Sequence, residues 1–506
     1  MPGAVRPGPC ALRRTGPHPP HAARGTTASG SFSAVSSAVS DFIEQTRLAA
    51  RAFADFGGHL FNPTVRLGVT GLSRAGKTVF ITALVHGLIR GGRFPVFEPL
   101  ANGRIAGARL APQPDDAVPR FDYERHVRAI VIDREWPDST RQISELRVVI
   151  DYQTSGGAMR TLTLDIVDYP GEWLLDLPLL GKTYEQWSAE TLSHLRRAAR
   201  PPLPKPFLEQ IAAVDPLAAA DENLAIEAAR LFTTYLHACR KEHRTLSLVS
   251  PGRFLMPGDL AGSPALTFAP LDVPAGQEAP SGSNWAMMRR RYDAYRDVVV
   301  RPFFREHFAR LDRQIVLVDA LAALDGGPEA VRDLQDALTA VLECSRVGRG
   351  GWLDALFRPS VDRILFAATK ADLIHHTSHD RLEAWLRRLT ESAVARAGDA
   401  GAAVDVIALA AVRATREATV RGEGGELPTI VGTAVPGEWS DGRHFDGTTE
   451  IALFPGDLPA EGLQGGDFRS IRFRPPALEE TDDGAPALPH IRLDRALQFL
   501  IGDRLR

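Results

Sequence analysis

Residues 64–78 read TVRLGVTGLSRAGKT, and the apolar run VFITALVHGLI follows at residues 79–89. The first part alternates and is rich in β-branched side chains, which predicts a strand, whereas the later run has the spacing of a buried helix. Between them, residues 71–78 match the pattern GxxxxGK[ST]. In this pattern backbone N–H groups close around phosphates, a Lys reaches the β- and γ-phosphates, and a hydroxyl ligates Mg²⁺. The strand–loop–helix context therefore predicts a nucleoside triphosphate site rather than a glycine-rich surface turn.

Two side chains of this loop are predicted to carry the chemistry. Lys77 would stabilise the charge on the transferred phosphate, and the Thr78 hydroxyl would hold Mg²⁺. For Arg74 a structural or base-side role is preferred to that of an internal arginine finger. The predicted nucleotide contacts that complete the loop are Gly71, Ser73, Arg74, Ala75 and Gly76.

A second motif follows a predicted hairpin. Residues 146–152 and 160–167 are alternating runs separated by a turn rich in Gly, Ser and Thr, which is typical of two antiparallel strands. The second run ends in the sequence DYPG, from Asp168 to Gly171. An Asp at the carboxyl end of a strand beside the phosphate loop can hold Mg²⁺ through water, and the Gly171 N–H can contact a γ-phosphate.

Several assignments around this motif have alternatives. Asp165 competes with Asp168 for the metal but is less well placed, and without the phosphate loop Asp168 would be an ordinary turn residue. Glu172 is the predicted residue that orients the attacking water, with a solvent-facing carboxylate as an equally weighted alternative. Thr140 is the predicted effector-side Mg²⁺ ligand, ahead of Ser139, although both residues are also compatible with the simple start of a strand.

A base-reading motif follows two further predicted strands, at residues 313–319 and 363–368. The second of them ends at Thr369, Lys370 and Asp372, in the pattern TKxD. The Asp carboxylate in this pattern accepts hydrogen bonds from guanine N1 and N2, which adenine cannot satisfy, and the Lys stem covers the ring. TKxD alone carries little weight, but its position after this strand predicts recognition of guanine.

The order of the motifs is more specific than any one of them. A helix predicted at residues 380–396 leads to a strand at residues 404–409, and the small residues after it include Ala411 and Val412, whose backbone amides would approach the base. The phosphate loop, the hairpin with DxxG, the TKxD strand and the small-residue loop thus occur in sequence. Together they predict a single nucleotide pocket.

The fold class predicted from this order is α/β, a P-loop NTPase sheet with helices on both faces. More than a hundred residues separate Gly171 from the next strand, far beyond the roughly 30 that a βαβ step needs, so we predict a large, mainly helical insertion. A small β-rich extension is expected near the C-terminus. The predicted divisions are a disordered tail at 1–40, the first part of the P-loop domain at 41–172, the insertion at 173–310, the second part at 311–420 and the extension at 421–506.

Composition argues against several other classes of protein, namely nucleic-acid-binding, disulfide-rich, thiolate-zinc and membrane-spanning proteins. The chain of 506 residues has a formal net charge of −3, so no overall field would attract nucleic acid, and no nucleic-acid partner is expected. Its three cysteines lie far apart, which gives no support to a disulfide framework or a thiolate zinc site. His375 and His376 are interpreted as loop histidines because no second group of ligands has metal spacing. No apolar run is long enough to span a bilayer, so a cytoplasmic location is predicted.

The chain resembles the YcjX family of bacterial P-loop proteins over about residues 41–506. The residues that carry the resemblance are 68–82, 136–137, 143–147, 168–173, 307–319, 369–372, 412–415 and 488–495. The resemblance implies a stress-associated GTPase of the Ras-like and translation-factor class, with Mg²⁺ as cofactor and GTP and GDP as substrate and ligand. It also implies an inner-membrane partner protein, and with it peripheral association with the inner membrane as an alternative location. Glu172 in place of Gln, and Arg74 within the phosphate loop, depart from the small-GTPase pattern.

We therefore predict a slow, Mg²⁺-dependent GTPase. One alternative is an ATPase or kinase of the P-loop class in which TKAD is incidental. Another is a membrane-associated scaffold that uses the nucleotide state to recruit partners and turns over negligibly.

Overall fold

The computed structural model describes residues 63–72, 74–138, 140, 142–196, 205–242, 250–344, 361–399, 401–422, 425–440, 443–459, 468–478 and 486–506. The predicted tail, Ser73 and Ser139 lie outside these residues. Asn62–Arg506 form one compact unit.

A seven-stranded sheet lies at the centre of this unit, in the order β2-β3-β4-β1-β5-β6-β7. Its strands are β1 (Thr64–Gly71), β2 (Ile105–Ala111), β3 (Ser144–Gln153), β4 (Met159–Asp168), β5 (Arg313–Val318), β6 (Arg363–Ala368) and β7 (Ala403–Ala408). The five strands from β4 to β7 are parallel, while β3 is antiparallel to both of its neighbours. The carboxyl ends of the parallel strands therefore meet at one edge of the sheet. The chain passes from β4 on one side of β1 to β5 on the other, which is the kind of switch point where α/β folds bind ligands.

Helices cover both faces of the sheet, as predicted. Along β5, Ile315 and Leu317 belong to one hydrophobic core and Val316 and Val318 to the other, because successive side chains point to opposite faces. The first core includes α2 (Lys77–Arg90) and α16 (Leu493–Ile501). The second includes α12 (Ala320–Asp325), α13 (Pro328–Cys344), α14 (His379–Leu389) and α15 (Glu391–Asp399). The α/β fold with a mostly parallel sheet is thus confirmed.

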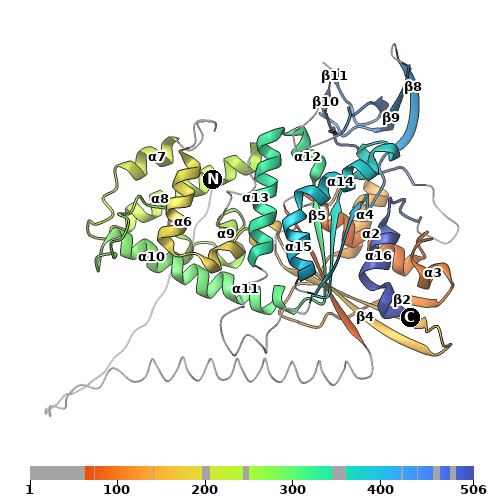
Figure 1. The fold of residues 1–506 in the computed structure, drawn as a ribbon, viewed down its shortest axis with the longest axis horizontal. Coiled ribbons are helices and arrows are strands. Elements are labelled where there is room, and N and C mark those ends of the chain that lie inside the picture. Colours follow the sequence, from red (N-terminus) through yellow and green to blue (C-terminus); the bar gives the residue numbers. More distant parts are fainter. Residues whose placement is uncertain are drawn as a thin grey trace, which may run out of the picture. The chain divides into compact units, whose positions relative to one another are not determined.

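Helices dominate the stretch between β4 and β5, and Figure 1 shows several of them grouped to one side of the sheet. They are α5 (Gly171–Leu174), α6 (Tyr184–Leu195), α7 (Lys205–Ala212), α8 (Glu222–Glu242), α9 (Gly252–Leu255), α10 (Asn284–Ala294) and α11 (Arg301–Glu306). Aromatic rings hold them together, for example Trp187 stacked on Tyr292 with ring centroids 5.3 Å apart. The domain boundaries at 173, 310 and 420 stay predictions.

Several elements differ from the sequence-based expectation. The strand β2 at the sheet edge was not predicted. The helix predicted at 380–396 is two helices, because α14 ends at Leu389 and α15 begins at Glu391, with the Thr390 hydroxyl donating to the Leu386 carbonyl oxygen between them. Two short helices on the amino-terminal side of the hairpin, α3 (Glu98–Ala101) and α4 (Tyr123–Arg128), were also not predicted.

The C-terminal region combines a small sheet with a returning segment. β8 (Arg416–Gly422), β9 (Gly425–Thr433) and β12 (Glu450–Leu453) form a three-stranded antiparallel sheet, and β10 (Trp439–Ser440) pairs with β11 (Arg443–His444). The chain then returns to the main sheet, where Ala410 and Ile491 exchange backbone hydrogen bonds of 3.1 and 2.8 Å. This contact places the C-terminal segment beside the loop that follows β7.

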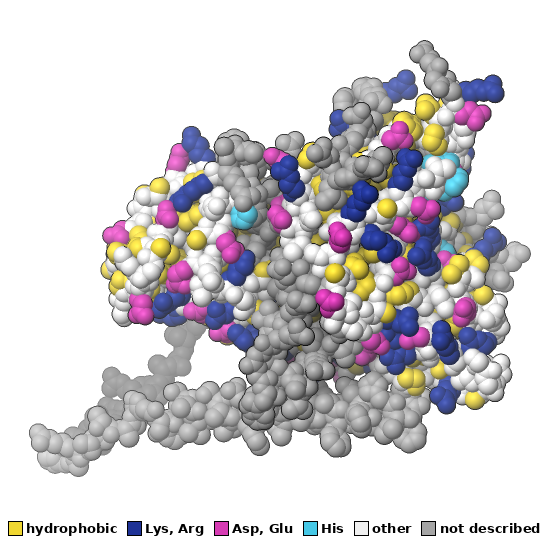
Figure 2. Space-filling view, in the orientation of Figure 1, with side chains coloured by type: hydrophobic (Ala, Val, Ile, Leu, Met, Phe, Trp, Pro, Cys, Tyr) yellow, Lys and Arg dark blue, Asp and Glu magenta, His cyan; other side chains and the backbone are white. Residues whose placement is uncertain are grey.

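The described surface mixes charges of both signs. On the face shown in Figure 2, Lys and Arg side chains alternate with Asp and Glu side chains over most of the described elements. Among the described residues, the structure contains no helix with the length and apolarity needed to cross a membrane.

Candidate nucleotide-binding site

The phosphate loop joins β1 to α2 at the switch point of the sheet. Gly76 precedes α2 with φ of 86°, a left-handed conformation that favours glycine. Arg74 has φ of 64° and an exposed side chain, whereas Ala75 is buried. The first turn of α2 contains no acidic residue. The first backbone N–H groups of α2 have no partner within the helix, so together with the helix dipole they favour an anion at this point.

Lys77 is buried within the loop that it belongs to. Its Nζ donates to the carbonyl oxygen of Gly71 at 2.9 Å and lies 3.4 Å from that of Leu72. These contacts hold the ammonium group at the end of β1. Its positive charge also lowers the pKa of Asp168, which opposes the stronger effect of burial on that carboxylate.

The structure brings together the three predicted metal ligands, Thr78, Thr140 and Asp168. The Thr140 Oγ1 donates to Asp168 Oδ2 at 2.7 Å and lies 3.3 Å from the Thr78 Oγ1. Asp168 ends β4 directly beside Val69 of the parallel strand β1, so the sheet register fixes its position next to the phosphate loop. Two hydroxyls and a carboxylate are the oxygen ligands that Mg²⁺ prefers.

The burial and the hydrogen bonding of Asp168 are also compatible with a bound cation. Its side chain is 2 % exposed, and its Oδ1 is buried with no hydrogen-bond partner among the described residues. Burial raises the pKa of Asp168 to about 6, with Lys77 and Thr140 acting in the opposite direction. A buried carboxylate oxygen without a partner is costly, and a bound cation would compensate it.

Asp165, the competing metal candidate, is engaged elsewhere. Its two carboxylate oxygens accept from Arg147 Nε and Nη2 at 2.6 and 2.7 Å, a bidentate ion pair across the hairpin. It lies an odd number of residues from Asp168 along β4, so the two side chains point to opposite faces. The geometry favours Asp168.

Gly171 and Glu172 begin α5 against the phosphate loop. A Cβ at Gly171 would come within 2.3 Å of the Gly71 carbonyl oxygen, so the close approach of the two loops requires glycine. Glu172 is 4 % exposed, and the alternative of a solvent-facing carboxylate is therefore wrong. Its role in orienting water stays a prediction.

The DxxG segment is anchored to the helices that follow it. Asp176 accepts from the Gly252 N–H at 2.6 Å through Oδ1 and from the Tyr295 hydroxyl at 2.7 Å through Oδ2. The Arg253 guanidinium lies 3.2 Å from the centre of the Trp173 ring, a cation–π contact. The segment after DxxG is therefore attached to α9 and to Tyr295, the residue directly after α10.

The residues predicted to read the base follow β6 at the same edge of the sheet. Lys370 has a left-handed φ of 60°, and its Nζ pairs with Asp319 Oδ2 at 2.5 Å. Thr369 donates to the Val318 carbonyl oxygen at 3.3 Å. Asp372 is 6 % exposed, and burial raises its pKa to about 6.

The loop after β7 packs directly on Asp372. The Ala414 N–H donates to Asp372 Oδ2 at 2.9 Å, and the Thr415 Oγ1 donates to the Asp372 carbonyl oxygen at 2.5 Å. Ala411 is half-buried and Val412 is buried in this loop. The loop is supported from behind by the C-terminal segment, since the Arg413 N–H donates to the Pro489 carbonyl oxygen at 2.7 Å.

The phosphate loop and the loop of the TKxD motif share one edge of the sheet. Only β5 separates β1 from β6, and all three strands are parallel. Neighbouring strands lie about 4.8 Å apart, so the ends of β1 and β6 are separated by about 10 Å. Sequence reasoning missed Asp319, Ala414 and Thr415 as partners of this region. Asp319 stands at the carboxyl end of a predicted strand, and Ala414 and Thr415 lie in the stretch 412–415 that carries the family resemblance, but neither signal predicts these contacts.

Comparison with known proteins gives a consistent result over most of the chain. A model of the YcjX-like family, DUF463, matches residues 65–505. A relative from Escherichia coli, named Ras-like GTPase YcjX, is 38% identical over 465 residues, which cover 87% of this chain and 96% of the relative. A relative of the same name from Shewanella oneidensis is 35% identical over 470 residues, which cover 87% of this chain and 94% of the relative.

Proposed function

Because the chain belongs to the YcjX-like family, we propose that it binds guanine nucleotides together with Mg²⁺ and slowly hydrolyses GTP to GDP and phosphate. One observation carries the proposal. The oxygen cluster of Thr78, Thr140 and Asp168 lies beside the phosphate loop, at the same sheet edge as the buried carboxylate of Asp372. The Ras-like GTPase name of the relatives supports the same interpretation.

Each residue of the pocket receives a role in this proposal. Backbone N–H groups at the start of α2 bind the phosphates, and Lys77 stabilises the negative charge that develops during transfer. Thr78, Thr140 and Asp168 hold Mg²⁺, which when bound neutralises charge on the phosphate oxygens. Glu172 orients the attacking water.

The base side favours GTP over ATP. Asp372 is buried, and its Oδ2 accepts from the Ala414 N–H at 2.9 Å. A buried carboxylate discriminates strongly between guanine and adenine, because a base that cannot donate hydrogen bonds to it leaves the charge unpaired. Thr369 and Lys370 shape the same loop.

A scaffold that reports its nucleotide state is the second candidate function. The specific observation in its favour is the attachment of the segment after DxxG to α9 and to Tyr295, through Asp176 and Arg253. In such a protein the helices after β4 would respond to the nucleotide while hydrolysis is negligible. The inner-membrane partner stays a prediction.

Calorimetry with GTP, GDP, ATP, and GDP plus EDTA tests the proposal. We expect GTP and GDP to bind, EDTA to weaken GDP binding, and ATP to bind at least about a hundredfold more weakly. A preference for ATP would contradict the base assignment and favour the ATPase alternative. Steady-state turnover, measured with and without liposomes, then separates a GTPase from a scaffold without turnover.

Mg²⁺ binding is expected to weaken as the pH falls through 6. Asp168 must be ionised to bind the cation, and burial raises its pKa to about 6, so protons compete with Mg²⁺ below that value. The expected loss of Mg²⁺ affinity is about tenfold between about pH 7 and pH 5. Titration of Mg²⁺ into the GDP-saturated protein measures it.

The Asp168→Asn variant is the control for this titration. The nucleotide phosphate also titrates near pH 6. Any change of Mg²⁺ affinity with pH that remains in Asp168→Asn is therefore due to GDP. The difference in pH dependence between the wild type and the variant is due to the Asp168 carboxylate. Equal pH dependence in both proteins would contradict the role of Asp168.

A further inference from the structure

We propose that His375, His376 and Glu417 form a second metal site, which takes Zn²⁺ and braces the two loops around Asp372. The histidines follow the TKxD motif, and Glu417 lies on β8, which begins directly after the loop that packs on Asp372. The metal site itself is independent of the proposed function. Its effect on nucleotide release rests on that function.

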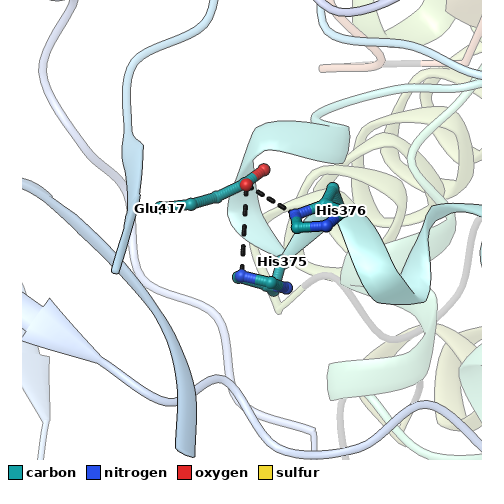
Figure 3. A group of neighbouring side chains, drawn as sticks. All are labelled: His375, His376 and Glu417. Carbon is teal, nitrogen blue, oxygen red and sulfur yellow. Dashed lines mark hydrogen bonds and ion pairs between the residues drawn. The ribbon is translucent and has the colours of Figure 1, made fainter. Parts of the chain in front are cut away.

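The three side chains converge on one point, as Figure 3 shows. Glu417 Oε2 lies 2.6 Å from His376 Nδ1 and 4.0 Å from His375 Nε2. One ligand atom from each residue lies within 4.8 Å of the other two. In a tetrahedral zinc site with bonds of about 2.1 Å, ligand atoms are about 3.4 Å apart. Small side-chain rotations would therefore bring the three atoms to coordination distance.

Neighbouring groups orient the ligands toward this point. His375 Nδ1 lies 3.0 Å from the Thr377 Oγ1 and accepts from the Thr377 backbone N–H at 3.5 Å. Zn²⁺ on His375 Nε2 would require the proton to sit on Nδ1, where the Thr377 hydroxyl can accept it. Arg413 Nη2 lies 3.4 Å from Glu417 Oε1, which leaves Oε2 to face the rings. Such outer contacts are typical of metal sites, where they fix the tautomer and the direction of each ligand.

The ligand types distinguish this site from the Mg²⁺ cluster. Two imidazoles and one carboxylate suit Zn²⁺ and related transition metals, whereas hydroxyls and carboxylates suit Mg²⁺. Three protein ligands leave a fourth position for water. The His376 side chain is 62% exposed, so a metal ion can enter from solvent, while the His375 side chain is 13% exposed and fixed in place.

Metal at this point would connect two segments that already hold Asp372. Ala414 and Thr415 donate hydrogen bonds to Asp372, and Glu417 follows them on the same strand end. The histidines follow Asp372 on the other segment. A bond through the metal would add to these hydrogen bonds, so we expect Zn²⁺ to slow the release of a bound guanine nucleotide.

Zn²⁺ binding to the metal-free full chain, measured by competition with a chromophoric chelator, tests the site. We expect one Zn²⁺ per wild-type chain and more than about tenfold weaker binding in Glu417→Gln and His375→Asn. His444→Asn, which removes an exposed histidine on β11 that does not belong to the three-residue group, is the matched control and should bind as the wild type does. Because His376 is largely exposed, His376→Gln gives a third ligand variant with little risk to folding. Wild-type Zn²⁺ affinity in the ligand variants, or no Zn²⁺ binding by the wild type, would overturn the site.

Release of a fluorescent GDP analogue, with and without Zn²⁺, tests the bracing effect. We expect slower release with Zn²⁺ in the wild type and in His444→Asn, and no change in Glu417→Gln. Zn²⁺ that binds and leaves the release rate unchanged would overturn the bracing effect. If the analogue does not bind at all, the proposed function fails, and the Zn²⁺ titration still decides the metal site by itself.

Discussion

Asp372→Asn is expected to change the preferred base from guanine to xanthine. The carboxylate accepts from guanine N1 and N2, whereas an amide presents a donor at one of its two positions, which matches the carbonyl oxygen that xanthine carries there. The Ala414 N–H donates to Asp372 Oδ2, and the amide oxygen of Asn can keep that contact. Sites built on a buried hydrogen bond reject the wrong partner by about 10⁴-fold, so the GTP to XTP preference should shift by about that factor. Competition binding with GTP, XTP and ATP measures the shift.

Asp380→Asn is a matched control for this substitution. Asp380 lies eight positions further along the chain, and its side chain is 89% exposed, where it pairs with Arg492. The Asp380→Asn variant should bind GTP, XTP and ATP with the same order of affinities as the wild type. If Asp372→Asn also keeps that order, Asp372 does not read the base. If both variants lose binding, the thermal unfolding temperature will show whether the loop has lost its structure.

The strands that were predicted correctly are those with the strongest local pattern. β5 and β6 are short apolar runs, and all six residues of β5 are buried. β2 escaped prediction because it lies at the edge of the sheet, where only some of its residues are half-buried and Gly107 interrupts the pattern. The break between α14 and α15 was missed because apolar spacing continues through Thr390, and a hydrogen bond to the preceding turn gives little sequence signal.

In the candidate site too, features set by local sequence were predictable, whereas contacts between distant segments were not. The phosphate loop is contiguous, so its residues can be recognised, and their roles predicted, from spacing alone. The pairings of Lys370 with Asp319 and of Asp372 with Ala414 join residues that lie more than forty positions apart. Glu417 likewise reaches the histidine pair only through the fold. No spacing rule predicts such contacts, because the order of the strands creates them.

Lys77→Ala is expected to slow GTP hydrolysis by about 10²- to 10³-fold in single-turnover assays. The Lys77 Nζ is held by the Gly71 and Leu72 carbonyl oxygens within the phosphate loop, so its charge is in place before the nucleotide arrives. A preorganised charge of this kind stabilises the transition state without reorganisation. Loss of the charge would also raise the pKa of Asp168 further and weaken Mg²⁺ binding near neutral pH.

The comparison variants for Lys77→Ala separate chemistry from folding. Lys205→Ala removes an exposed lysine of α7 that faces Glu209, and it should hydrolyse GTP at the wild-type rate. Glu172→Ala should retain nucleotide binding and slow only the chemical step, because its predicted role is to orient water. A wild-type rate for Glu172→Ala would contradict that role alone. A wild-type rate for Lys77→Ala would contradict the phosphate loop as the site of hydrolysis, since no other described residue of the loop carries a buried positive charge.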